Sequence, residues 1–254
     1  MGAGWPVLPV FCDVRRPTAC YVHTSMSLSS QATSEKAPGQ RFLNESMPRY
    51  GLPKWIDLPS DPTLSIFGAT TLPHLLTQQD LRKLPLTAVN ADFHCVTTWS
   101  VPDLHWHGWA FADVWQDFIA EFADPAVSHV RFSALDGYAV TIPLEELLKE
   151  GVLIATHLSH EPLTVKHGAP LRLVLPQLYG YKSLKHLYRL ELLTRPIPSS
   201  ATSRILIHPR GRVDLEERSS TGLPLFWRTL YRWQLPNFLR QAAGWQERDR
   251  ETAS

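Results

Sequence analysis

Cys95 is the residue of this chain whose type and position could do the most chemistry. The other two cysteines, Cys12 and Cys20, fall in an irregular N-terminal stretch, so we expect no disulfide framework. A lone internal cysteine is most often a small buried hydrophobe. Its thiolate is also a soft, charged metal ligand, so the interpretation of Cys95 depends on its neighbours.

Histidines near Cys95 and further along the chain offer one kind of partner. They are His94, His105, His107, His157, His160 and His167. Cys95 with two histidines would make a chemically reasonable zinc site, although no pair has a convincing helical ligand spacing. A hydrolase with a cysteine nucleophile is a further alternative, but no recognisable local motif ties an acid or a base to Cys95.

Two stretches of sequence carry the strongest patterns. The first is Asn90-Ala91-Asp92-Phe93-His94-Cys95-Val96-Thr97-Thr98-Trp99-Ser100, and the second runs from His167-Gly168-Ala169-Pro170 to Lys182-Ser183-Leu184-Lys185. With Pro48-Arg49-Tyr50-Gly51 before them and Asp136-Gly137-Tyr138 between them, they resemble the sulfite-oxidase-fold family of molybdopterin-dependent oxidoreductases. The match is closest to its small, haem-free branch, which includes methionine-sulfoxide reductase catalytic subunits.

The resemblance implies a cofactor and a set of residues that hold it. In the family, one cysteine ligates molybdenum beside two pterin sulfurs, and Cys95 occupies that position. The matched cofactor contacts are Arg49, Ser133, His167, Arg172, Ser183, Leu184 and Lys185. Their types suit the pterin phosphate, because Arg172 offers a planar fork of donors and Lys185 a point charge. A zinc site would leave this segment unexplained.

The segment after Cys95 bears on the reaction. Relatives that oxidise anions place arginines there, whereas this chain has Val96-Thr97-Thr98-Trp99, with no cation. We therefore expect reduction of a neutral S-oxide or N-oxide, from a small molecule or a methionine-sulfoxide-like substrate. The alternatives are sulfite-type oxidation by the same cofactor and a non-catalytic binding protein on the same fold. No Cys-x-x-Cys-His haem motif or iron–sulfur cysteine cluster is present, so a separate haem or flavin protein should carry the electrons.

Composition limits the other classes of function. The 254 residues fit one large domain with or without appendages, and at 44% hydrophobic they can bury a core. A net charge of +1 gives no sign of nucleic acid as a partner. Arg15-Arg16 is not followed by an apolar signal core, so we expect a cytoplasmic protein. The residues after Thr194 are too few for the dimerisation domain of the sulfite oxidases, which favours a monomer.

Short strands alternate with short helices along the body of the chain. Apolar patterns predict strands at 63–67, 129–132, 138–142, 152–156, 171–175 and 186–193. Helices are predicted from a capping box at Thr77 through Lys83, at 110–123, and at 144–150 after Pro143. The mixture indicates an α+β fold with a mostly β mixed core and a C-terminal helical extension.

The chain divides into three predicted parts. Residues 1–37 form a flexible leader, 38–195 the molybdopterin-binding oxidoreductase domain, and 196–254 a C-terminal extension. The extension is predicted to hold a hairpin at 204–215 and an amphipathic helix at 224–240 that Pro236 should break or kink. We expect this helix to dock on the catalytic domain. The alternative is a peripheral membrane contact, since tryptophans and arginines suit that boundary.

Overall fold

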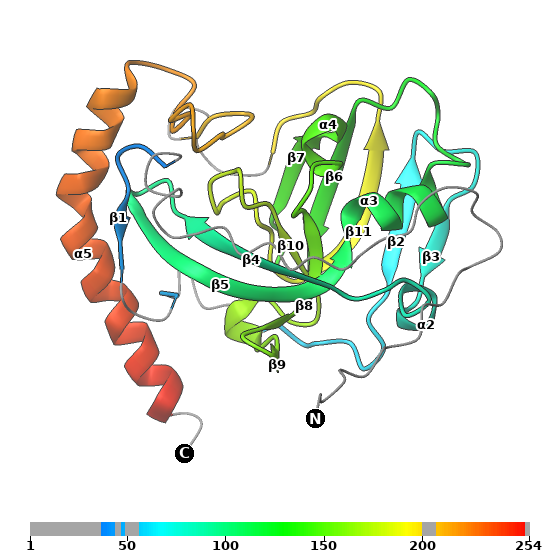
Figure 1. Ribbon diagram of the computed structural model, residues 1–254, viewed down its shortest axis with the longest axis horizontal. Coiled ribbons are helices and arrows are strands. Elements are labelled where there is room, and N and C mark those ends of the chain that lie inside the picture. Colours follow the sequence, from blue (N-terminus) through cyan, green and yellow to red (C-terminus); the bar gives the residue numbers. More distant parts are fainter. Residues whose placement is uncertain (1–36, 44–46, 49–55, 200–206, 252–254) are drawn as a thin grey trace, which may run out of the picture.

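Two β-sheets and one long C-terminal helix are the main elements of the fold (Figure 1). The computed structural model describes residues 37–43, 47–48, 56–199 and 207–251, with side chains to residue 240. Nearly all of the predicted leader, and Arg49, lie outside these ranges. The α+β class with a mostly β core is confirmed.

The first sheet contains the longest strand, β5 (Trp99–Ala110), with partners on both edges. Antiparallel β4 (Thr87–His94) lies along one edge, and the other edge pairs with β1 at one end and β8 at the other. The remaining bounds in this sheet are β1 Arg41–Phe42, β8 Leu153–Leu158, β9 Glu161–Pro162 and β10 Arg172–Val174. Because β4 and β5 are consecutive, they form a hairpin whose connecting loop is Cys95–Thr98.

The second sheet has the order β3-β2-β11-β6-β7, with β11 parallel to β2 and antiparallel to β6. Its strands are β2 Leu64–Gly68, β3 His74–Leu76, β6 His129–Ala134, β7 Ala139–Pro143 and β11 Leu187–Leu193. In β6 the buried residues alternate, as Val130, Phe132 and Ala134 do, which is the period of a strand with one face in the core. The predicted strands therefore all exist, with ends shifted by a few residues.

Short helices connect the strands. α2 (Gln78–Leu81) begins with the predicted capping box, in which Asp80 N–H donates to Thr77 Oγ1 and Thr77 N–H donates to Asp80. The predicted helix at 110–123 is split into α3 (Phe111–Val114) and a π-helical turn, η1 (Trp115–Ile119). The other two are α4 (Leu144–Leu147) and the 3-10 turn η2 (Val165–His167).

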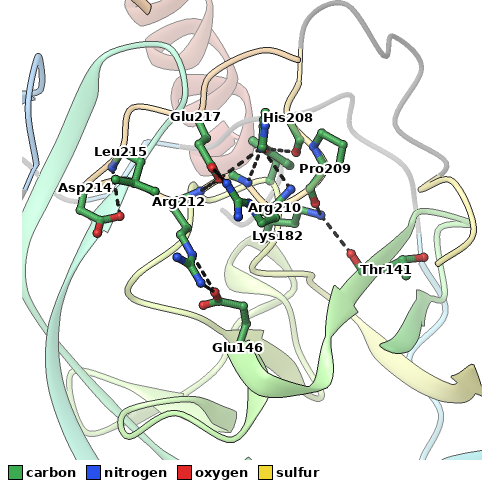
Figure 2. A network of polar contacts seen from close by, with 12 residues as sticks. Thr141, Glu146, Lys182, His208, Pro209, Arg210, Arg212, Asp214, Leu215 and Glu217 are labelled. Carbon is green, nitrogen blue, oxygen red and sulfur yellow. Dashed lines mark hydrogen bonds and ion pairs between the residues drawn. The ribbon is translucent and has the colours of Figure 1, made fainter. Parts of the chain in front are cut away.

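Polar contacts fasten the start of the C-terminal extension to the domain (Figure 2). The buried Lys182 donates from Nζ to the carbonyl oxygens of Thr141, at 3.0 Å, and of Pro209. Arg212 pairs with Glu146, whose side chain is fully buried. Residues 207–215, the described part of the predicted hairpin, form turns and a single bridge from Arg212 to Leu178 instead of paired strands. Arg212 binds Glu146 of the domain, whereas His208 Nδ1 accepts from the N–H groups of Arg210 and Gly211 within the segment itself.

Helix α5 (Pro224–Glu251) docks on the first sheet, as Figure 1 shows beside β1. Trp227, Tyr231 and Leu235 are buried at a spacing of four residues, and the ring of Phe238 stacks on Trp99 at 5.9 Å. Pro236 was predicted to break or kink the helix; the break is wrong, since the helix continues through Pro236, and the kink stays a prediction. Pro236 lies on the exposed side, where water can bind the carbonyl that its missing N–H leaves unpaired.

The side of α5 that faces away from the sheet is partly apolar. Phe226 is 60% exposed and Trp233 is 77% exposed. Within the described residues no helix is long and apolar enough to cross a bilayer. Docking on the domain is therefore what the structure shows, and peripheral membrane contact through 224–240 stays a prediction.

Replacing Arg212 with Gln tests how firmly the extension is held. Burial acts to raise the pKa of Glu146, but hydrogen bonds from Lys149 and Arg212 outweigh it and lower the pKa. We expect Arg212→Gln to reduce the free energy of unfolding by about 1–2 kcal/mol. This is less than for a fully buried pair, because Arg212 is partly exposed and Lys149 remains.

The pH dependence follows from the lowered pKa of Glu146. The difference between wild type and Arg212→Gln should be full above the ordinary glutamate pKa and disappear as the pH falls through the lowered one. Denaturant unfolding at several pH values measures it. An equal difference at all pH values would contradict the role of Glu146.

Candidate active site around Cys95

Cys95 begins the tight loop that joins β4 to β5. Its N–H donates to Trp99 O at 2.8 Å, and Thr98 N–H donates back to Cys95 O at 3.2 Å. Thr98 has a φ of 72°, in the left-handed region that β-branched residues rarely adopt. The loop therefore holds an uncommon backbone conformation next to the candidate ligand.

The thiol of Cys95 is buried beside a hydroxyl group. Cys95 is 8% exposed, and its Sγ lies 3.1 Å from Thr97 Oγ1. Burial raises the pKa of Cys95 above its usual value, although the hydrogen bonds of Thr97 and the charge of Arg218 act to lower it. The thiol is therefore protonated at neutral pH until a metal ion displaces the proton.

The stretch from His167 to Lys185 folds directly against the stretch that carries Cys95. Gly180 N–H donates to His94 O at 2.7 Å, one residue before Cys95. A Cβ atom on Gly180 would come within 2.2 Å of the Phe93 ring, so any other residue would force that ring to move. The two stretches that carry the family resemblance therefore meet in the fold.

Arg172 lies fully buried where these two stretches meet. Its guanidinium stacks on Phe93 and Trp106, with Cζ 5.3 and 5.0 Å from the ring centroids. Nη1 donates to His167 O at 2.9 Å, whereas the buried Nε has no hydrogen-bond acceptor among the residues placed by the structure. Burial lowers the pKa of Arg172 to about 10, so it keeps its charge at neutral pH.

No ion pair joins Arg172 to a carboxylate among the residues that the structure describes. A buried cation is costly unless an anion compensates it. Arg172 therefore has the environment of a ligand-binding residue, since a bound phosphate would supply the missing negative charge and accept from Nε.

Four other predicted cofactor residues, His167, Ser183, Leu184 and Lys185, lie near Arg172 in the structure. Ser183 Oγ accepts from Leu175 N–H at 3.1 Å, and Leu184 is buried with its carbonyl accepting from Leu173 N–H. Lys185 Nζ donates to Lys166 O at 2.8 Å, beside η2. Burial, and then the charges of Arg172 and the nearby lysines, lower the pKa of His167 to about 4, so His167 is neutral at pH 7.

No described contact places Ser133 or Arg49 near Arg172, although both were predicted to contact the cofactor. Ser133 lies on β6 in the second sheet, paired with Ala139 and Arg189. Arg49 falls outside the described residues. Their cofactor roles stay predictions.

The histidines do not assemble a zinc site within the described residues. His107 lies 4.8 Å from His160 between ring centroids, and His105 lies 5.9 Å from His160, but no group of three or more ligating side chains forms there. His94 is next to Cys95 in sequence, yet its Nδ1 lies 2.8 Å from Ser100 Oγ and burial lowers its pKa to about 4. The zinc interpretation therefore finds no support in this part of the chain.

Sequence reasoning missed two residues that hold the Cys95 loop. Gln40 Nε2 donates to Cys95 O at 3.1 Å, and Arg218 Nη1 donates to Val96 O at 2.7 Å. Both lie far from Cys95 along the chain and in no recognised motif. The sequence offered no signal for Gln40 and Arg218 beyond their polar character. Their role depends on contacts between the Cys95 loop and segments that lie far from it in the sequence.

Comparison with known proteins identifies the domain. A family model described as the oxidoreductase molybdopterin binding domain matches residues 51–201, more than half of the chain. This chain belongs to that family. The buried Cys95 and the buried cation of Arg172, which has no ion pair among the described residues, both lie within the matched range and fit the family's cofactor, since they provide a soft ligand and a phosphate partner.

Proteins similar to this chain include oxidoreductases of several bacteria. The uncharacterised oxidoreductase YuiH of Bacillus subtilis is 38% identical over 126 residues, covering 49% of this chain and 61% of that protein. The protein-methionine-sulfoxide reductase catalytic subunit MsrP of Gluconobacter oxydans is 30% identical over 156 residues, covering 54% of this chain and 49% of that protein. The chain thus spans about half to three fifths of the length of these relatives.

One solved structure is also similar to part of this chain. The sulfane dehydrogenase SoxCD from Paracoccus pantotrophus is 20% identical, with a TM-score of 0.49 over 59% of this chain and 43% of that chain.

A pair of substitutions distinguishes a ligand-binding arginine from a structural one. Arg172 and Arg218 are equally buried, but only Arg218 has several acceptors in the described residues. In cofactor-free protein, Arg172→Met should change the free energy of unfolding by less than about 1 kcal/mol, whereas Arg218→Met should cost about 3 kcal/mol. Denaturant unfolding measures both, and a larger loss for Arg172→Met would assign it a structural role.

Proposed function

We propose that this protein is a molybdenum–pterin oxidoreductase that reduces a neutral S-oxide or N-oxide, with Cys95 as the protein ligand to the metal. The observation that carries the proposal is a buried thiol together with a buried cation for which the described residues provide no carboxylate. Cys95 lies in the apolar cluster of Met47 and Trp106, and the guanidinium of Arg172 stacks on Trp106 and lies 3.9 Å from Met47 Sδ. The soft ligand Cys95 and the phosphate partner Arg172 thus contact the same apolar cluster.

The residues of the chain have separate tasks in this account. The molybdenum–pterin group, when bound, supplies two-electron redox chemistry. Cys95 binds the metal as a thiolate after losing its proton, and Arg172 binds the pterin phosphate. Ser183 and Lys185 add donors to that phosphate site. Trp99 and Trp106, which are almost fully buried, exclude water around the ligand.

The choice of a neutral oxide rests on the charges that reach the Cys95 loop. Val96, Thr97 and Thr98 bring no cation of their own. Arg218 does approach the loop, but its side chain has no exposed surface and its Nη atoms donate to protein acceptors. It therefore offers nothing to an anionic substrate such as sulfite. The names of the MsrP relatives support an S-oxide as substrate.

A separate haem or flavin protein is proposed as the electron carrier. The chain contains no haem-attachment motif and no iron–sulfur cysteine cluster. Methionine-sulfoxide-like groups and small-molecule oxides are the substrates to screen, and a cytoplasmic monomer stays a prediction. Sulfite-type oxidation is the competing function, and the non-catalytic alternative requires that no oxide be turned over.

Steady-state assays on the molybdenum-loaded protein test the direction and class of reaction. With reduced viologen dye as donor, methionine sulfoxide, dimethyl sulfoxide and trimethylamine N-oxide should oxidise the dye, and Cys95→Ser should not support this above background. Sulfite with ferricyanide should give little turnover. Fast sulfite oxidation with no reduction of any oxide would overturn the proposal in favour of sulfite-type chemistry.

A further inference from the structure

We propose that Arg218, in the C-terminal extension, is a positioning residue for the metal ligand: it fixes the Cys95 loop and sets the charge around it. This inference rests on the proposed role of Cys95. Arg218 lies outside the range 51–201 that the family model matches. The extension would then be part of the active-site machinery and not only a cover for the domain.

Backbone carbonyls of the Cys95 loop are held from outside the hairpin. Cys95 O accepts from Gln40 Nε2, and Thr98 O accepts from Arg41 N–H at 2.8 Å. Val96 O, the carbonyl next to the ligand, accepts from Arg218 Nη1 at 2.7 Å. Because Thr98 has an unfavourable backbone conformation, the loop needs such external bonds to keep its shape.

The guanidinium of Arg218 is itself held on several sides. Nη2 donates to Pro38 O and to Glu216 Oε1, each at 3.2 Å, and Cζ lies 5.0 Å from the centroid of the Tyr179 ring. The side chain has no exposed surface. The buried guanidinium of Arg218 therefore contacts three separate segments: the Cys95 loop, the N-terminal segment at Pro38, and Tyr179 in the stretch from His167 to Lys185.

A chain of ion pairs links Arg218 to the long helix. Glu216 accepts from Arg218 and also from Arg228 on α5, through both of its oxygens. One carboxylate thus serves two guanidinium groups, and these three side chains keep a net positive charge beside the loop. The placement of α5 is thereby coupled to the position of Val96 and Cys95.

The charge has a consequence for the bound metal. Arg218 is close enough to act electrostatically on Cys95. A positive charge near a metal centre stabilises the reduced state, which carries more negative charge, in a buried region where screening is weak. Removing it should lower the midpoint potential of the molybdenum couple, whereas a residue that only anchors the extension should leave the potential unchanged.

Arg212 provides the matched control on the same segment. It also ties the extension to the domain, through Glu146, but none of its described contacts reaches the Cys95 loop. Arg218→Gln, Arg218→Lys and Arg212→Gln are compared with the wild type. Arg218→Lys keeps the positive charge but has a single donor atom in place of the guanidinium fork. It therefore separates the effect of the charge from the effect of the full set of hydrogen bonds.

Two readouts test the inference, one of them independent of the cofactor. In cofactor-free protein, amide hydrogen exchange of a peptide covering 95–99 should accelerate in Arg218→Gln about tenfold more than exchange of a peptide from β6 and β7, which reports the global loss of stability. In loaded protein, redox titration should show a lowered midpoint potential and a shifted thiolate-to-molybdenum absorption band for Arg218→Gln. Arg218→Lys should keep the wild-type potential. Arg212→Gln should keep the wild-type potential and show no excess acceleration at 95–99 over the β6 and β7 peptide.

Each outcome decides the matter. Wild-type exchange at 95–99 in Arg218→Gln, or the same change in Arg212→Gln, would overturn the inference. If Arg218→Gln loosens the whole fold, Arg218→Lys decides by whether its exchange is faster only in the loop. A wild type that binds no molybdenum would refute the proposed function, while the exchange result would still report on the loop.

Discussion

The burial of the Arg172 charge is the constraint around which the site is organised. A guanidinium without exposed surface destabilises a fold unless something compensates it. Within the part of the chain that the structure describes, the compensation is incomplete: two aromatic faces, one carbonyl oxygen and a sulfur atom contact the guanidinium, and Nε has no acceptor. Such an arrangement is understandable if the fold is adapted to an anion, and it lies where the two characteristic motifs meet.

The C-terminal extension changes how the domain should be viewed. Lys182 and Arg212 attach it at one place, and Arg218 reaches the loop that carries Cys95. Phe238 of α5 then stacks on Trp99 at the start of β5. The ligand loop is therefore surrounded by chain from both ends of the protein, and a truncated domain would lose contacts directly at the candidate metal site.

Local patterns in the sequence predicted most of the elements. Strands such as β6 and helix starts such as the Thr77 capping box depend on neighbouring residues, so their signals are visible in the chain. Of the predicted hairpin at 204–215, the described residues 207–215 form turns, because Arg212 binds Glu146 of the domain and His208 accepts from Arg210 and Gly211. No local pattern reveals the contact with Glu146. Pro236 did not end α5, because packing on the sheet outweighs one missing hydrogen bond.

The residues of the candidate site also divide into those that local sequence predicted and those that it did not. Cys95 and Arg172 were predictable because they lie in motifs that resemble a known family, and the fold brings those motifs together. Arg218 and Gln40 were not, since their roles are set by contacts between distant segments. Long-range contacts of this kind become visible only in the folded structure.

Metal content is the most direct test of the central claim. Wild type and Cys95→Ser would be expressed with molybdate, purified and analysed by mass spectrometry for molybdenum and zinc. The account predicts stoichiometric molybdenum in the wild type and loss of the metal or of its thiolate absorption band in Cys95→Ser. A well-folded wild type that contains zinc and no molybdenum would contradict it.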